Sequence, residues 1–263
     1  MDKVAQDLNS GRLGTSPPVV HLHTGDLVNT AVLTEDRLAN TWRARLTDAP
    51  WALAVGNHDF WDNTRTPDQA ARALGWPAGN HALDLGAVRL LTVVPAGFYS
   101  SSGTDAWVLP PATLTWLDGQ LGADSRPTFI ACHVPLQEQF GVYRRGYVTE
   151  PGPAIIQLLD AHPNAVAWLS GHIHTRFDQP RMFLTTTLPS GRPFVCVNTS
   201  ATGAYTSAGA STWRFDPIWS VYLHYFGDLL EVRVRDHGAG RWGYRRVAKV
   251  ATLRLASSPV ARS

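Results

Sequence analysis

Two histidines separated by one residue carry the strongest chemical signal in this chain. His172 and His174 follow Gly171 and the apolar run 165–169. Imidazole nitrogens bind divalent transition metals, and a chain that turns as it leaves a strand can bring both rings to one point. A His-x-His pair alone is more often structural than metal-binding, so the interpretation depends on partners elsewhere in the sequence.

Three further motifs supply such partners, because each follows a short apolar run. Asp26 comes after a glycine, Asn57 and His58 come after another, and His133 follows the run 128–132. The carboxyl ends of strands in an open α/β sheet face one crevice, so these side chains are expected to converge. Carboxylate, amide and imidazole ligands together favour Mn, Fe, Co, Ni or Zn over Ca or Mg. The predicted metal ligands are Asp26, Asn57, His133, His172 and His174.

Two residues beside the Asn57 position have a predicted catalytic role. His58 is placed to act as an acid or a cation toward a leaving oxygen, and Asp59 is a candidate to orient its ring. Phe60 follows them and is a candidate to line the substrate cleft, although a core or rim position is the default expectation. Arg144 and Arg145 lie in the loop 140–149 and are candidates to bind phosphate, although a solvated loop is the default expectation.

Apolar spacing predicts the elements that position these motifs. The predicted strands cover 19–23, 51–55, 88–94, 128–132, 165–169, 194–198, 221–226, 229–235 and 247–255. The predicted helices cover 1–9, 34–48, 111–121 and 155–159, with one more from the cap residue Thr66 to Gly75. Strands and helices alternate over the first two thirds, and the last third is rich in strands. This order predicts an α/β sandwich of two packed mixed sheets flanked by helices.

Length and composition limit the classes of function. With 263 residues, the chain suits one domain over 1–263: a helix and loop to residue 18, a motif-bearing core over 19–200, and a strand-rich part over 201–263. The formal charge of +2 gives no basic footprint, so a nuclease is a disfavoured alternative. No run is long enough for a membrane span and the start lacks a signal-peptide layout, so we expect a cytoplasmic protein. The sequence does not indicate an oligomeric state.

Taken in order, the motifs Gly25-Asp26, Gly56-Asn57-His58-Asp59, His133 and Gly171-His172-Ile173-His174 resemble the signature of the calcineurin-like metallophosphoesterases. The resemblance covers about residues 19–200. It implies a two-sheet sandwich and two divalent transition metals. Asp26 would bridge both cations, Asn57, His133 and His172 would complete one site, and His174 would belong to the other. The implied reaction is hydrolysis of a small phosphomonoester or phosphodiester by a metal-bound hydroxide, with His58 as the catalytic histidine.

The sequence departs from this family pattern at its start. The family opens with an Asp-x-His at the end of a first strand, and no such pair precedes Asp26. Two explanations stay open. The favoured one is a shortened active enzyme whose first strand is missing, and the other is an impaired binding module that has lost one metal site. Asn29, where purple acid phosphatases have tyrosine, and Asp59, where protein phosphatases have glutamate, point instead to bacterial phosphodiesterases and phosphatases of small substrates.

Overall fold

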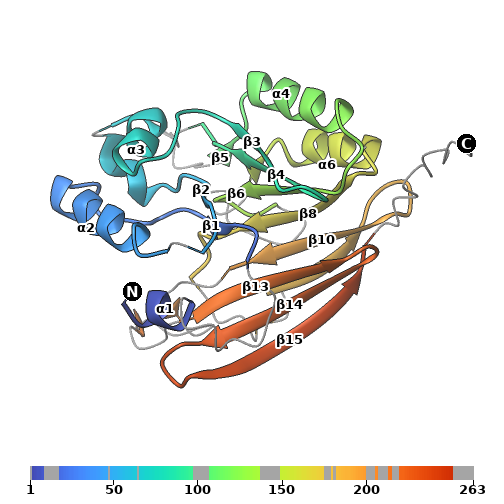
Figure 1. The fold of residues 1–263 in the computed structure, drawn as a ribbon. Coiled ribbons are helices and arrows are strands. Elements are labelled where there is room, and N and C mark those ends of the chain that lie inside the picture. Colours follow the sequence, from blue (N-terminus) through green and yellow to red (C-terminus); the bar gives the residue numbers. More distant parts are fainter. Residues whose placement is uncertain are drawn as a thin grey trace, which may run out of the picture.

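The computed structural model describes residues 2–8, 18–46, 48–63, 65–96, 107–136, 149–174, 179, 182–199, 205–206, 213–214 and 219–250. Figure 1 shows two layers of strands, with helices outside them. The expected α/β sandwich of two packed layers is confirmed. None of the helices in the described ranges is both long and apolar enough to cross a membrane.

The first layer is a six-stranded mixed sheet. Its four central strands are parallel, and its two edge strands run antiparallel to their neighbours. Every residue of the strands Arg89–Val93, Thr128–Cys132 and Ala165–Ser170 is buried, which explains why their sequences are largely apolar rather than alternating between apolar and polar residues. In spatial order the strands are β3 (His81–Asp84), β4 (Arg89–Val93), β6 (Thr128–Cys132), β8 (Ala165–Ser170), β10 (Pro193–Asn198) and β9 (Phe183–Thr187).

Three helices accompany one face of this sheet: α3 (Pro67–Ala73), α4 (Pro111–Gly122) and α6 (Gly152–Ala161). Leu117 of α4 and Ile155 of α6 are fully buried in the same core as Trp168 of β8. The predicted start of α3 is confirmed as a capping box. The Thr66 side chain accepts a hydrogen bond from the backbone of Gln69, whose own side chain accepts one from the backbone of Thr66.

The second layer covers the other face of the six-stranded sheet and consists of two pieces (Figure 1). One piece is the parallel pair β1 (His21–His23) and β2 (Trp51–Leu53), and the other is the antiparallel sheet β13 (Trp219–Phe226), β14 (Leu229–Asp236) and β15 (Arg241–Lys249). Both pieces contribute to one core with Phe129 and Val166 of the first layer.

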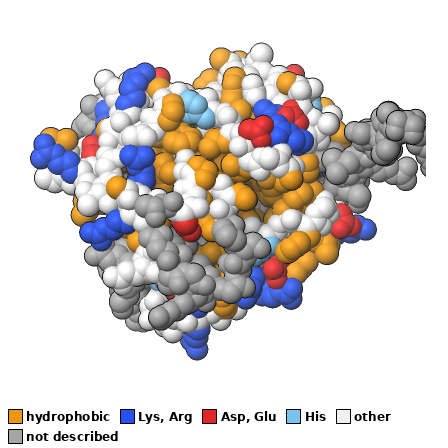
Figure 2. Space-filling view, in the orientation of Figure 1, with side chains coloured by type: hydrophobic (Ala, Val, Ile, Leu, Met, Phe, Trp, Pro, Cys, Tyr) orange, Lys and Arg blue, Asp and Glu red, His pale blue; other side chains and the backbone are white. Residues whose placement is uncertain are grey.

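Half-buried apolar side chains mark the seam between the layers. Leu22 of β1 and Val221, Leu223 and Tyr225 of β13 pack against the shared core but keep part of their surface exposed. Figure 2 shows hydrophobic side chains gathered in a hollow across the middle of the side of the molecule that faces the viewer.

The remaining described elements are short or lie outside the layers. They are α1 (Asp2–Leu8), α2 (Leu33–Arg43), the 3-10 helix η1 (His58–Asn63), the parallel pair β5 (Trp107–Val108) and β7 (Thr149–Glu150), and the antiparallel pair β11 (Tyr205–Thr206) and β12 (Trp213–Arg214). Asp7 of α1 forms an ion pair with Arg235 of β14 at 2.6 Å and a hydrogen bond with His237 at 2.8 Å. These contacts attach α1 to the C-terminal strands.

Some predicted boundaries were wrong. Helix α2 ends at Arg43 and not at residue 48, and β15 begins at Arg241 rather than at residue 247. Residues 251–255 of that predicted strand lie outside the described residues. Strands β3 and β9 were not predicted. They are edge strands with half-exposed, mixed residues, so they lack the apolar runs of the buried strands.

Candidate metal centre

Four turns bring the predicted ligands together. Asp26 follows β1, Asn57 follows β2, His133 follows β6 and His172 follows β8. The first two strands belong to the second layer and the last two to the six-stranded sheet. The site therefore lies where strands of both layers end, rather than along one edge of a single sheet.

Three side chains meet at hydrogen-bonding distance. Asn57 Oδ1 lies 3.1 Å from His133 Nε2 and 3.0 Å from His172 Nδ1, and these two nitrogens are 3.2 Å apart. Asp26 Oδ2 lies 3.2 Å from His133 Nε2. Ligand atoms about 2.0 to 2.2 Å from a common cation are themselves roughly 3 Å apart, so this spacing fits a divalent transition metal.

The ring of His133 is held in the orientation that a metal ligand needs. Its Nδ1 lies 2.6 Å from the carbonyl oxygen of Thr24, to which it can only donate. That contact places the proton on Nδ1 and leaves Nε2 to face Asp26 and Asn57. The side chain is almost completely buried. His133 therefore presents a fixed nitrogen toward the centre of the cluster.

His174 lies farther from this group. Its Nε2 is 4.0 Å from Asp26 Oδ2, and part of its ring is exposed. Among the described residues, the ligand atoms that all lie within 4.8 Å of one another belong to Asp26, His133 and His172. Asp26 thus lies near His174 as well as near His133.

Opposite charges shift the titration of the cluster. Burial disfavours the Asp26 carboxylate, but His133, together with His58, outweighs burial and holds the pKa of Asp26 well below its usual range. Burial likewise disfavours a charged His133, yet the Asp26 carboxylate raises the pKa of that ring. Burial lowers the pKa of His174. The site thus combines an anionic oxygen with imidazole nitrogens, as expected for bound cations.

Two of the clustered residues have left-handed backbone conformations. Asp26 has φ 55° and His172 has φ 66°, which side chains other than glycine rarely adopt. The turn beside Asp26 also needs close approach of the backbone, because a Cβ atom at Gly56 would overlap the amide and carboxylate of Asp26. Surrounding contacts must hold both turns in these conformations.

Asp59 provides such contacts, and the prediction that it orients His58 is corrected. Its buried carboxylate accepts hydrogen bonds from the backbone N–H groups of residues 26, 27, 28 and 56 at 2.8 to 3.1 Å. Burial and the nearby Asp26 carboxylate raise the pKa of Asp59 to about 6. Asp59 therefore ties the turn after β1 to the turn after β2, and both of its oxygens are engaged in doing so.

The ring of His58 is oriented by a different group. Its Nδ1 lies 2.8 Å from the carbonyl oxygen of Asn29, and its backbone N–H donates to Asp26 Oδ1 at 2.8 Å. The carbonyl contact places a proton on Nδ1, so Nε2 is the nitrogen available for proton exchange. His58 is partly exposed, as a residue that meets substrate would be.

The predicted substrate residues have different outcomes. Phe60 is only 5% exposed and its ring packs edge-on against Trp107, which in turn contacts His172. The Phe60 side chain thus packs against the ring that contacts His172, and it has little exposed surface left for a substrate. Arg144 and Arg145 lie outside the described residues.

Sequence reasoning missed the groups that support the ligands. Two of these groups are the backbone carbonyls of Thr24 and Asn29, and the third is the side chain of Asn198, which binds a backbone carbonyl. Such contacts depend on where the backbone runs, which residue types do not reveal. Asn198 alone left a signal, since it ends the predicted strand 194–198 in the same way that the other site residues follow strands.

Fold and site together define a two-layered α/β protein with a carboxylate, amide and imidazole centre suited to divalent metals. The sequence pattern of the family described as calcineurin-like phosphoesterase matches residues 3–176, and the chain belongs to that family. No curated protein sequence matches the chain.

Two solved structures share the fold. A dimetal phosphatase from Danio rerio is 12% identical with a TM-score of 0.61, and the match covers 94% of this chain and 88% of that one. The purple acid phosphatase PPD1 from yellow lupin (Lupinus luteus) seeds is 16% identical with a TM-score of 0.62. That match covers 95% of this chain but only 48% of the lupin chain. At these identities the likeness concerns the fold.

Proposed function

We propose that this chain hydrolyses small phosphomonoesters or phosphodiesters with divalent transition metals bound at the cluster around Asp26. Membership in the calcineurin-like phosphoesterases supports the class of reaction. The observation that carries the proposal is the convergence of Asp26, Asn57, His133 and His172 from four separate turns, with four pairs of their ligand atoms 3.0 to 3.2 Å apart.

Each residue has a part in this proposal. Asn57, His133 and His172 would hold one cation together with Asp26, and His174 would hold a second cation that shares Asp26. Bound cations would supply Lewis acidity toward the phosphoryl oxygens and an activated water molecule.

His58 would handle the proton. The carbonyl of Asn29 fixes its Nδ1–H, so Nε2 can donate to the leaving oxygen, and its backbone contact with Asp26 keeps the ring beside the metal ligands. Phosphate recognition by Arg144 and Arg145 stays a prediction. We also infer one domain over residues 1–263, because both cores pack on the same six-stranded sheet.

The test is turnover of bis(p-nitrophenyl) phosphate and p-nitrophenyl phosphate by cation-free protein after addition of Mn²⁺. We expect Mn²⁺-dependent hydrolysis of at least one of them. His58→Gln should lower kcat by about 100- to 10,000-fold while Mn²⁺ still binds. His133→Gln should weaken Mn²⁺ binding itself. His81→Gln, whose ring contacts the carbonyl of Ala78 away from the site, is the control. Wild-type protein with confirmed bound Mn²⁺ and no turnover would count against the proposal.

One observation favours a second candidate, a binding module with a single cation. The tight cluster among the described residues contains Asp26, His133 and His172, while the Nε2 of His174 lies 4.0 Å from Asp26 Oδ2, beyond the spacing of that cluster. Metal analysis of the loaded protein separates the candidates. Two ions per chain with turnover support the hydrolase, and one ion without turnover supports the binding module.

A further inference from the structure

The strand beside β8 ends in a buried polar side chain that hydrogen-bonds the turn leading to His172. Asn198 is the last residue of β10 and pairs in register with Ser170, the last residue of β8. It is 1% exposed and lies beyond residues 3–176, which match the family pattern. The sequence from residue 171 to 174 continues directly from Ser170 into the two predicted histidine ligands.

The amide of Asn198 binds the turn that carries His172. Its Nδ2 group donates one hydrogen bond to the carbonyl oxygen of Gly171 and another, at 3.1 Å, to Ser170 Oγ. The next residue adds to this contact, because the N–H of Thr199 donates to the Ser170 carbonyl at 2.7 Å. Two consecutive carbonyls before His172 are thereby fixed by the end of β10.

The Gly171 carbonyl belongs to the peptide that determines how His172 leaves the strand. Rotation of that peptide changes φ of His172, which is 66° and unfavourable for a residue with a side chain. A hydrogen bond to this carbonyl opposes the rotation. It therefore helps to keep His172 Nδ1 at 3.0 Å from Asn57 Oδ1 and 3.2 Å from His133 Nε2.

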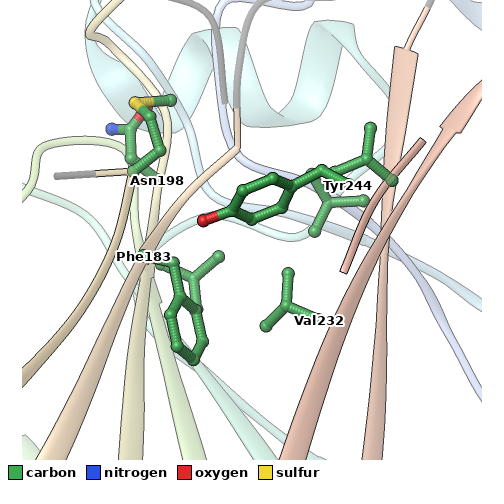
Figure 3. Close-up of a pocket in the computed structure, with 8 residues that line it drawn as sticks. Phe183, Asn198, Val232 and Tyr244 are labelled. Carbon is green, nitrogen blue, oxygen red and sulfur yellow. The ribbon is translucent and has the colours of Figure 1, made fainter. Parts of the chain in front are cut away.

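The placement of Asn198 has a cost that packing alone does not explain. Its Oδ1 is enclosed and has no hydrogen-bond partner among the described residues, although a buried polar atom left unsatisfied costs about 1–3 kcal/mol. Asn198 also lines a small pocket between the layers whose other lining is mainly apolar, including Phe183, Val232 and Tyr244 (Figure 3). An apolar side chain would suit these surroundings, so the contact with Gly171 is the feature that requires an amide.

We propose that Asn198 is a positioning residue for the metal centre, which sets the turn at Gly171 so that His172 can bind a cation. The inference depends on the metal site of the proposed function, but not on turnover. Removal of the amide should weaken cation binding even though Asn198 touches no predicted ligand atom. Residues that orient ligands in this way typically change metal affinity by about 10- to 100-fold when substituted.

Co²⁺ binding tests this role, because its visible absorption reports the coordination of the ion as well as its affinity. Asn198→Leu should bind Co²⁺ about 10- to 100-fold more weakly than wild type, with a changed spectrum. Asn164→Leu is the matched control. Asn164 is also buried, donates to the carbonyls of Leu121 and Asp124, and precedes the other end of β8. It should lose stability but keep the affinity and spectrum of wild type.

Asn198→Asp provides a second variant in case the leucine variant does not fold. It has nearly the same shape but replaces the donor with an oxygen, so it should also bind Co²⁺ more weakly. Wild-type affinity and spectrum in a folded Asn198 variant would overturn the inference, as would an equal loss in Asn164→Leu. Wild-type protein that binds Co²⁺ without hydrolysing esters would refute the proposed hydrolase but leave the role of Asn198 to be decided by these variants.

Discussion

His23 should make the folded state less stable as the pH falls from 7.5 to 5. Its ring packs against both Trp42 and Trp51, and its Nδ1 is enclosed without a partner among the described residues. Burial outweighs the attraction of Asp26 and lowers the pKa of His23 from 6.5 to about 4. The substitution that isolates this effect is His23→Leu, which removes the titrating group and keeps an apolar side chain beside the two tryptophans.

The magnitude follows from proton linkage. Above pH 6.5 both folded and unfolded His23 are neutral, so the ring adds no pH dependence there. Between pH 6.5 and 4 the unfolded chain binds a proton that the folded protein does not, and stability falls as the pH falls. With pKa values of 6.5 and about 4, the loss between pH 7.5 and 5 is up to about 2 kcal/mol.

The assay is urea unfolding of wild type and His23→Leu at several pH values in EDTA, so that no cation competes for the nearby ligands. The difference in unfolding free energy between the two proteins should change by about 2 kcal/mol in favour of the variant on going from pH 7.5 to 5. A constant difference in unfolding free energy between the two proteins does not affect the test, since only the change of that difference with pH is used. His162→Leu, near the surface beside Asp118, is the control. If the unfolding free energies of wild type and His23→Leu depended on pH in the same way, the reasoning would be refuted.

Three further predictions concern the site and its supports. Gly56→Ala should abolish tight Mn²⁺ binding in calorimetry, because its methyl group would overlap Asp26; wild-type binding would contradict the described turn. Arg65→Met should lower the free energy of unfolding by about 3 kcal/mol, because it leaves the buried Asp36 carboxylate without the guanidinium that binds both its oxygens. A loss below about 1 kcal/mol would show that this ion pair contributes little to stability. Addition of Mn²⁺ at about 100 times its Kd should stabilise the cation-free protein by about 2.7 kcal/mol in thermal unfolding, and an unchanged Tm would argue against a preformed site.

The sequence was informative where local patterns decide the structure. The apolar runs of β4, β6, β8 and β10 were predicted because buried parallel strands are apolar throughout. The start of α3 was predicted because Thr66 and Gln69 stand at the spacing of a capping box. The ligand cluster was predicted because polar residues follow strands, and strand ends converge.

The parts that could not be predicted depend on distant backbone groups. Asp59 was expected to orient His58, which is adjacent to it in the sequence. Its real partners include backbone N–H groups of residues 26 to 28, more than thirty positions earlier. Every residue but proline carries an N–H, so no side-chain pattern identifies which ones a carboxylate will bind. For the same reason the carbonyl of Asn29 could not be identified as the partner of His58.

The hydroxyl contact between Thr24 and Thr199 has a consequence for the order of folding. It joins residues 175 positions apart, and Asn57 meets His172 across 115 positions. Loops of this length close slowly, and strands that pair over long separations form late. We therefore expect the cation centre to be completed late in folding, once the distant strands that carry its ligands have come together. A newly made chain would gain its metal affinity near the end of folding. Cation binding would therefore mark fully folded molecules and would not direct the early steps of folding.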